Sequence, residues 1–267
     1  MTSPAPYPGF QAFKFDRPAS GVLRLWIDTG APFNGVTHAN HHEFGEIWRA
    51  VASEDDVRVV VVRGTGGIFC ATGDLTFLNP LVESHVTRAR VYEDIRALVL
   101  NMLDCPLPIV SSIEGVCSGA GLAVALMADV SIAARSATLM EGHVMAGLAC
   151  GDHAALSWPL LMGMAKAKYH LLTATPLTGD EAERSGLIAL AVDDADLHAR
   201  ALEVATRLAA LPPEATRLTK RALNGWYRMA QPIFEQAAAY EAFGFAGDTV
   251  RSIVQGQSQP PSGAQRQ

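Results

Sequence analysis

The sequence predicts an α/β fold with parallel strands, followed by a helical C-terminal region. In the first half of the chain, apolar β-rich runs alternate with helical patterns, the strands at 22–27, 57–62, 109–113 and 130–133 and the helices near 39–52, 86–103 and 121–128. Strands that alternate with helices indicate parallel pairing, because a parallel crossover connection usually contains a helix.

The last third of the chain carries almost no strand signal. After Asp152 the pattern is helical, over about 153–174, 180–186, 195–210, 214–229 and 232–251. One helix has clear ends: Thr178 precedes an acidic first turn and Gly186 follows the last periodic residue. This spacing predicts an N-cap at Thr178 and a left-handed glycine at Gly186.

The length and composition predict one core domain with an appendage. The chain has 267 residues, of which 49% are hydrophobic, enough for a substantial core. Proline-rich and Gln/Ser/Gly-rich ends are typical of poorly ordered termini. We expect a loose N-terminus over 1–17, a core over 18–196, a helical region over 197–252 and a disordered tail over 253–267.

Charge and cysteine content exclude several classes of protein. The net charge is −6 and no Lys/Arg block occurs, which excludes the electrostatic footprint of a nucleic-acid binder. The four cysteines show no CxxC spacing, so we expect free thiols in a reducing, cytoplasmic protein rather than disulfides or a zinc site. No apolar run approaches the roughly 18 residues of a membrane span.

Three segments together resemble the crotonase, or enoyl-CoA hydratase/isomerase, superfamily. They are RVVVVRGTGGIFCATGDL (58–75), PIVSSIEGVCSGAGLAVALMADVSIAARSATLMEGHVMAGL (108–148) and PLTGDEAERSGLIALAVDDADL (176–197). The resemblance covers roughly residues 18–252. It implies a crotonase-like spiral of ββα repeats with a C-terminal helical trimerisation region, and an assembly that is a homotrimer or a dimer of trimers.

The resemblance also implies a chemistry and a site. Members of this family stabilise an enolate with two backbone N–H groups, which by position are those of Gly73 and Ala120 here. Both residues lie in small-residue loops that follow apolar runs, and N–H groups at the start of a helix have no intrahelical partner. Ordinary strand-to-helix turns remain the alternative. Asp74, Leu75 and Ala123 are the candidates for substrate contact.

Two positions depart from the family's hydratases, which handle water with two glutamates. By alignment these glutamates fall on Ala123 and His143. Alanine cannot transfer a proton, so hydration by the two-glutamate mechanism is not expected. An imidazole with a pKa near 6.5 can still act as acid or base.

The altered residues resemble the branch represented by 6-oxocamphor hydrolase, which cleaves a carbon–carbon bond between two ketones. This resemblance implies catalytic roles for His143, Asp152 and Glu241. A further histidine of that branch has no counterpart in SGAGLAVAL. Asp152 can orient His143 or cap a helix that begins at His153 or Ala154, and His143 can be a buried histidine bonded to a carbonyl.

The remaining polar residues near these positions are expected to have lesser roles. Glu141 and His153 should support the site or face solvent. His38, His41 and His42 have spacings that could bind a metal, but a solvated first helical turn is the simpler reading. We therefore expect neither a metal nor another cofactor, with an acyl-CoA possible as substrate.

Three functions stay open. The first is an enoyl-CoA hydratase/isomerase-like enzyme with altered acid/base residues, because most proteins with this frame act on acyl-CoA. Binding CoA requires cationic side chains for its phosphates, and the sequence that follows Asp74 contains none. These cations must therefore come from Arg24, Arg63, Lys166, Lys168 or a neighbouring subunit. The second is a β-diketone hydrolase, which the site residues alone favour, and the third is a non-catalytic binding protein.

Overall fold

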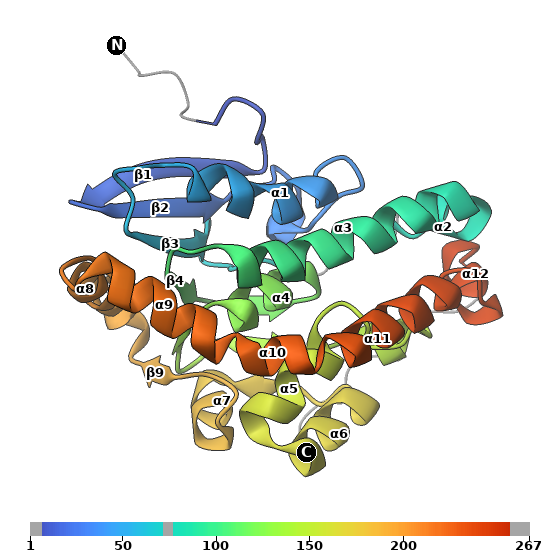
Figure 1. Cartoon of the computed structure of the whole chain (residues 1–267). Coiled ribbons are helices and arrows are strands. Elements are labelled where there is room, and N and C mark those ends of the chain that lie inside the picture. Colours follow the sequence, from blue (N-terminus) through green and yellow to red (C-terminus); the bar gives the residue numbers. More distant parts are fainter. Residues whose placement is uncertain (1–6, 72–76, 257–267) are drawn as a thin grey trace.

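The larger of the two sheets formed by the described residues has six strands. The computed structural model describes residues 7–71 and 77–256. Six strands pair in the order β1 (Phe13–Ala19), β2 (Val22–Ile27), β3 (Val59–Gly64), β4 (Ile109–Ile113), β6 (Val130–Ala134) and β9 (Leu190–Val192). The β1–β2 pair is antiparallel and all the others are parallel (Figure 1). The predicted α/β fold is confirmed.

A second, smaller sheet shows how the chain spirals. Its strands pair in the order β5 (Val116–Ser118), β7 (Thr138–Met140) and β8 (Leu177–Thr178). The chain passes from β4 to β5 and later from β6 to β7, each time from the large sheet to the small one before a helix follows. These successive ββα units are the crotonase-like architecture that the resemblance implies.

The helices cover the sheets and form the C-terminal region. They are α1 (His41–Ala52), α2 (Asn79–Glu83), α3 (His85–Asp104), α4 (Ala120–Met127), α5 (Ala154–Met162), α6 (Met164–Thr173), α7 (Gly179–Ser185), α8 (Leu197–Ala209), α9 (Pro213–Leu223), α10 (Gly225–Met229), α11 (Gln231–Gly244) and α12 (Asp248–Val254). Helices α9 to α11 form one long row, and α11 packs beside α3, where Arg96 Nε lies 2.7 Å from Glu235 Oε2 (Figure 1).

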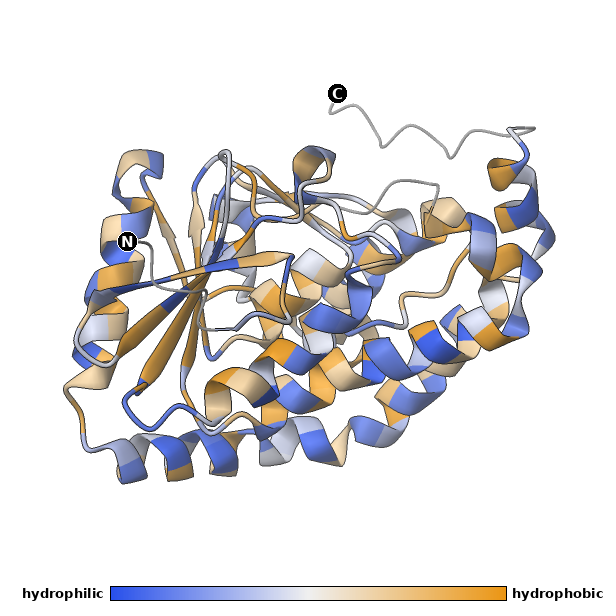
Figure 2. Ribbon diagram, turned by 90° about the horizontal axis from the view of Figure 1, so that it is seen from above, coloured by the Kyte–Doolittle hydropathy of each residue, from blue (hydrophilic) through white to orange (hydrophobic). Residues whose placement is uncertain are grey.

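The central strands are buried on both faces, as expected of a parallel sheet. Every residue of β4 is buried, including Ser111, and the strands stand out as hydrophobic in Figure 2. The hydroxyls of Ser111 and Ser131 donate to the carbonyl oxygen of Ala125, at 2.8 and 2.9 Å. These buried polar groups are therefore satisfied at the end of α4 and do not weaken the core.

Several sequence-based boundaries are confirmed and others need correction. Thr178 forms a full capping box with Glu181, and Gly186 has φ +85°, as predicted. Residues 13–17, expected in a loose N-terminus, instead belong to β1, because Phe13 is buried against the core and the strand pairs with β2. Strands β5, β7, β8 and β9 went unpredicted, since runs of two or three residues carry no readable periodicity.

Candidate active site

A small apolar cavity gathers most of the predicted site residues. It has a volume of about 280 Å³ and lies between α3, the start of α4 and the end of α11. Its polar lining consists of His41, His143, Asp152 and Glu241, and its apolar lining includes Ala120 and Ala123. Three larger hollows, of about 420, 450 and 700 Å³, contain none of these residues. The chemistry therefore points to the smaller cavity.

A tight turn after β7 positions His143. The residue opens a 3₁₀ turn at His143–Ala146 that ends at Gly147, whose φ of +78° favours glycine. A Cβ atom at position 147 would approach Thr249 Cγ2 to 2.7 Å, so α12 packs directly on this turn. The turn thus fixes the backbone from which the imidazole projects.

The His143 ring lies between two carboxylates. Its Nδ1 makes a very short contact with Glu141 Oε1, and the same oxygen accepts the backbone N–H of His143 at 3.2 Å. Its Nε2 lies 3.3 Å from Glu241 Oε1 on α11. Glu141, rather than Asp152, is the carboxylate that orients this ring, because it directly follows β7 and contacts Nδ1 of a residue only two positions later.

Burial and pairing shift the pKa values of these three groups. Burial alone would lower the pKa of His143, but the charges of Glu141, Glu241 and Asp152 outweigh it and raise that pKa well above 6.5. Burial would raise the pKa of Glu141, yet the charge and hydrogen bond of His143 hold it well below its ordinary value. For Glu241, burial prevails over the attraction of His143 and the pKa is raised. The site therefore contains an ion pair beside a carboxyl group that holds its proton more readily than usual.

Asp152 does not cap a helix. Its Oδ1 accepts the backbone N–H of the next residue, His153, at 2.7 Å, whereas α5 begins at Ala154 with His153 at the N-cap position. Its Oδ2 is buried and has no hydrogen-bond partner among the residues that the structure describes, and the side chain lines the cavity. Because its carboxylate already binds the His153 N–H, the group is fixed in place with one oxygen left to hold a ligand.

His153 is completely buried, which excludes the solvent-facing reading. Its Nδ1 lies 3.0 Å from Ser157 Oγ, and that hydroxyl donates to the His153 carbonyl oxygen. The hydroxyl proton is thus committed, so Nδ1 must donate to Ser157. Its Nε2 lies 3.6 Å from Glu141 Oε2 and 3.8 Å from Asp152 Oδ1, too far for hydrogen bonds.

Glu141, Asp152 and His153 also form the one group of potential metal ligands found among residues 7–71 and 77–256. One ligand atom each from Glu141, Asp152 and His153 lies within 4.8 Å of the others. Two carboxylates and one imidazole can bind a divalent ion such as zinc. Glu141, however, is already paired with His143, which leaves one of its oxygens for a metal. The expectation that the protein uses no metal stays a prediction.

Glycine at position 151 brings α11 to the site. A Cβ atom there would lie 2.4 Å from the Ala237 carbonyl oxygen and 2.8 Å from Glu241 Oε2. Only a residue without a side chain lets α11 approach this closely, and the approach is what places Glu241 beside His143. Gly151 went unpredicted, although a glycine directly before Asp152 could have indicated a close backbone contact.

His41 is a further site residue that the sequence reading passed over. It is buried, lines the cavity and lies 3.4 Å from Asp94 through its Nδ1, with its ring 5.4 Å from that of Phe77. The expected solvated turn is therefore wrong for His41, while His42 is exposed. The first buried turn of α1 presents one histidine to the cavity and the next to solvent.

The start of α4 supplies the described half of the proposed oxyanion hole. Ala120 begins the helix after Gly119, which has φ +56°, and lines the cavity. Ala123 faces the same cavity one turn later, so no proton-transferring group stands at this position. The other predicted donor, Gly73, lies with Asp74 and Leu75 outside the described residues.

Comparison with known proteins assigns the chain to a family. The sequence model of the enoyl-CoA hydratase/isomerase family matches residues 17–244. The chain belongs to this family. A 1,2-epoxyphenylacetyl-CoA isomerase from Escherichia coli K12 is 31% identical over 213 residues, which are 76% of this chain and 79% of that protein. Crotonase-superfamily membership is thereby confirmed.

Solved structures of the family share the whole fold. An enoyl-CoA hydratase/isomerase from Mycobacterium paratuberculosis is 28% identical, with a TM-score of 0.86 over 92% of this chain and 98% of that one. A β-diketone hydrolase from the cyanobacterium Anabaena, bound to (S)-3-oxocyclohexyl acetic acid, is 24% identical with a TM-score of 0.84 over the same shares. In the described part of this chain, no helix has the length and apolar character needed to cross a membrane.

Proposed function

We propose that this protein hydrolyses a carbon–carbon bond of a small β-diketone. The observation that carries the proposal is the His143 ring held between Glu141 and Glu241 at the wall of an apolar cavity, with Ala123 where a hydratase has its other carboxylate. This arrangement provides one coupled acid/base pair rather than two separate carboxylates. A single pair is sufficient for hydrolysis, because the proton taken from water is the one that the leaving carbon needs.

The proposed reaction begins with water at Glu241. In its ionised form Glu241 takes a proton from a water molecule, whose oxygen attacks one carbonyl carbon of the substrate. The bond between that carbon and the carbon shared by the two carbonyls then breaks. Its electron pair moves to the second carbonyl as an enolate, which the backbone N–H of Ala120 and that of Gly73 would stabilise. Glu241 returns the proton to the enolate carbon, leaving one carboxylic acid and one ketone.

The other charged groups stabilise ionised Glu241 and position the attacking water. The positive His143, fixed by Glu141, keeps Glu241 ionised for part of the time despite its burial. Asp152 lines the cavity and has one oxygen without a hydrogen-bond partner in the described part of the chain, which suits a hydrogen bond from the attacking water. In this scheme Glu241 is the acid/base, His143 its charged partner, and Glu141 a positioning residue.

The cavity favours a compact, largely apolar substrate. Its volume of about 280 Å³ lies near the lower end of the range of small-molecule sites, about 300–1,000 Å³. Its described lining is apolar apart from the two histidines and two carboxylates, and it contains no lysine or arginine. A cyclic diketone needs only carbonyl recognition and apolar contact.

A second candidate is isomerisation of an acyl-CoA. It is favoured by the relatives, since the Escherichia coli protein at 31% identity is named as an acyl-CoA isomerase. Moving a proton between two carbons of a thioester also needs only one acid/base pair, which His143 and Glu241 provide. Hydration of an enoyl-CoA fits less well, because Ala123 removes one of the two groups that handle water.

A paired substrate screen tests the proposal. Purified protein is incubated with cyclic 1,3-diketones or with crotonyl-type CoA esters, and products are identified by mass spectrometry. We expect a diketone to gain the mass of one water and yield a keto acid, and His143→Ala and Glu241→Gln to abolish this, while the exposed His42→Ala does not. Turnover of CoA esters alone would support the second candidate. Catalytic silence with both would support a non-catalytic binding protein.

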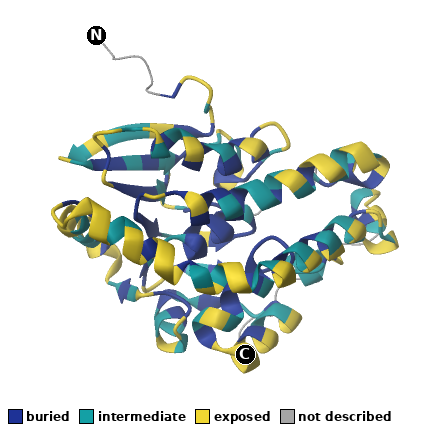
Figure 3. Ribbon diagram, in the orientation of Figure 1, coloured by how far each residue is buried: buried dark blue, intermediate teal, exposed yellow. Residues whose placement is uncertain are grey.

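We also propose that the C-terminal helices mediate a homotrimer or a dimer of trimers. Large apolar side chains are exposed along α9 to α11, among them Leu223, Trp226, Met229, Ile233 and Phe243. Figure 3 shows many exposed residues along these helices. An apolar row of this length is typical of a protein interface. The four cysteines are free thiols, which fits the expected cytoplasmic location.

A further inference from the structure

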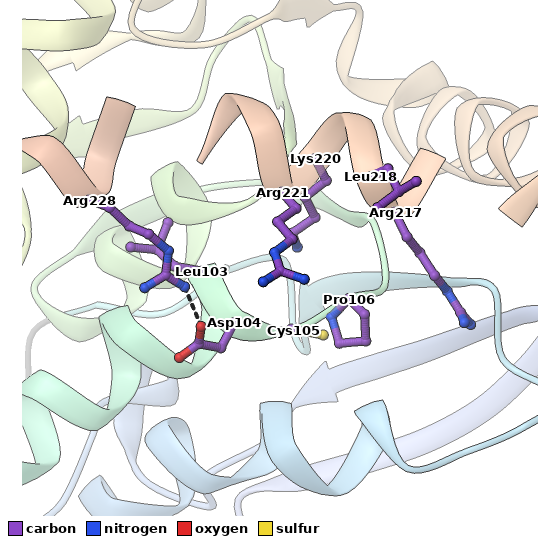
Figure 4. Close-up of a pocket in the computed structure, with 9 residues that line it drawn as sticks. All are labelled: Leu103, Asp104, Cys105, Pro106, Arg217, Leu218, Lys220, Arg221 and Arg228. Atoms are coloured by element: carbon purple, nitrogen blue, oxygen red, sulfur yellow. Dashed lines mark hydrogen bonds and ion pairs between the residues drawn. The ribbon is translucent and has the colours of Figure 1, made fainter. Parts of the chain in front are cut away.

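A second hollow lies at the C-terminal end of α3, whereas the catalytic cavity is lined by the middle of this helix. It has a volume of about 450 Å³ and is formed by the last turn of α3, the residues after it, α9 and α10 (Figure 4). It shares no lining residue with the catalytic cavity. Its lining contains four cationic side chains and one acidic one: Arg217, Lys220, Arg221, Arg228 and Asp104.

Two of these cations are neutralised within the protein. Arg228 forms a very short ion pair with Asp104, drawn as a dashed line in Figure 4. The buried Lys220 lies with its Nζ 2.8 Å from Asp129 Oδ2 and donates to the Leu107 carbonyl oxygen at 2.9 Å. Asp104 and Asp129 are thus both already paired with a cation.

The other two cations are Arg217 and Arg221. Among residues 7–71 and 77–256, neither Arg217 nor Arg221 forms an ion pair or a side-chain hydrogen bond, and Arg217 Nε is buried without an acceptor. The two residues are four apart on α9, so they lie on the same face of the helix. In Figure 4 their side chains leave α9 on the side of Pro106, with one guanidinium group on either side of that residue. Like charges at this spacing repel, so the helix gains nothing from them by itself.

Stabilisation of α3 does not explain these arginines. Cations near the C-terminal end of a helix can satisfy its last carbonyl groups. Here Asn224 Nδ2 donates to the Leu103 carbonyl oxygen in the last turn of α3 at 3.0 Å. Asn224 therefore performs that role, and the guanidinium groups of Arg217 and Arg221 stay available.

We propose that this hollow binds a phosphate-class oxyanion between Arg217 and Arg221. A guanidinium presents paired N–H donors that match two oxygens of a phosphate, and two such groups balance its negative charge. The gathering of four cations is notable in a chain whose net charge is −6. A volume of about 450 Å³ admits a phosphate attached to a small organic group as well as the free ion.

Calorimetric titration of the full-length protein tests this proposal with two probes. Inorganic phosphate represents the free ion, and adenosine 3′,5′-bisphosphate represents the phosphates of a nucleotide cofactor. We expect saturable binding of at least one probe that weakens as sodium chloride is added. Each guanidinium that contacts the anion should contribute more than about tenfold in affinity, as charge-assisted hydrogen bonds do. Arg217→Gln with Arg221→Gln should therefore abolish binding.

The matched control is Arg200→Gln, which removes an exposed arginine from α8, outside the hollow. It should leave binding unchanged. Thermal unfolding with phosphate, compared with chloride at equal ionic strength, provides a second readout: phosphate should raise the melting temperature of the wild type and of Arg200→Gln but not of the double variant. No saturable binding of either probe, or equal binding by the double variant, would overturn the proposal. Neither result depends on diketone or thioester turnover.

Discussion

The two hollows beside α3 differ in how their charged side chains are paired. Near Val91 and Ile95 the catalytic cavity buries His143 with carboxylates on both sides of its ring. Beyond Leu103 the second hollow is lined by Arg217 and Arg221, which form no ion pair with any described residue. A buried charge must be paired because desolvation is costly, whereas an exposed guanidinium such as that of Arg221 remains free to bind a ligand. The first arrangement suits proton transfer, and the second suits binding.

The largest effect should follow removal of the buried imidazole. His143→Ala deletes the positive partner of Glu241 and leaves Glu141 buried without its ion pair. We expect turnover of whichever substrate is accepted to fall by about 10²- to 10⁴-fold, the range of general acid–base catalysis. Steady-state kinetics measure this, with the exposed His42→Ala as control. Unchanged turnover would contradict a catalytic role for the buried cluster.

The pairing of Glu141 with His143 should set the pH dependence of stability. Because the folded pKa of His143 is raised well above 6.5, its proton stabilises the folded protein fully below pH 6.5. This contribution is lost as the pH rises through the folded pKa. Glu141→Gln removes the main partner, so the free energy of unfolding should decline less steeply above pH 6.5 than in the wild type.

Urea unfolding across this pH range checks the prediction, and activity adds a second readout. The alkaline limb of the pH–rate profile should move to lower pH in Glu141→Gln, because His143 then loses its proton earlier. Asp94→Asn, near His41 and outside the cluster, is the matched control. Parallel profiles for wild type and Glu141→Gln would show that Glu141 does not position the imidazole.

A smaller loss of turnover is expected from a substitution at Gly151, where the backbone lies close to α11. Gly151→Ala places a Cβ atom 2.4 Å from the Ala237 carbonyl oxygen and forces α11 away from the site. Overpacking of this kind costs about 1–3 kcal/mol of stability. Turnover should also drop, since Glu241 moves with α11. Gly225→Ala, at a position with no atom within 4 Å, is the control for chemical unfolding and kinetics.

The smallest effect should come from the unpaired arginines. Arg221→Gln removes an exposed group with no protein partner, so in the absence of ligand the free energy of unfolding should change by less than about 0.5 kcal/mol. Urea unfolding in phosphate-free buffer measures this. A decrease in the free energy of unfolding of more than about 1 kcal/mol would show that Arg221 stabilises the fold, and that the two hollows do not differ in the proposed way.

Periodicity and family motifs were sufficient to predict most of the fold. The buried runs of β2 and β4 were located to the residue, and α1, α3 and α8 within about two residues. The capping box at Thr178 was also readable, because its two partners are local in sequence. The short strands of the second sheet were not, since their pairing depends on residues far along the chain.

The site was predictable in its members and less so in their arrangement. His143, Asp152 and Glu241 do line one cavity, although Glu241 lies on α11, far along the chain from the other two. Sequence spacing could not show that Glu141, two residues from His143, would orient the ring while Asp152 faces the cavity. Nor could it show that His41 is buried, because the burial of a first helical turn is decided by what packs on it.

Incubation with a cyclic 1,3-diketone in water labelled with heavy oxygen tests the central claim most directly. The attacking water is proposed to become part of the product acid, so mass spectrometry should find one heavy oxygen in the carboxylate of a ring-opened keto acid. The wild type should form this product and Glu241→Gln should not. Recovery of unopened diketone, with conversion of a CoA ester by the same preparation, would contradict the account.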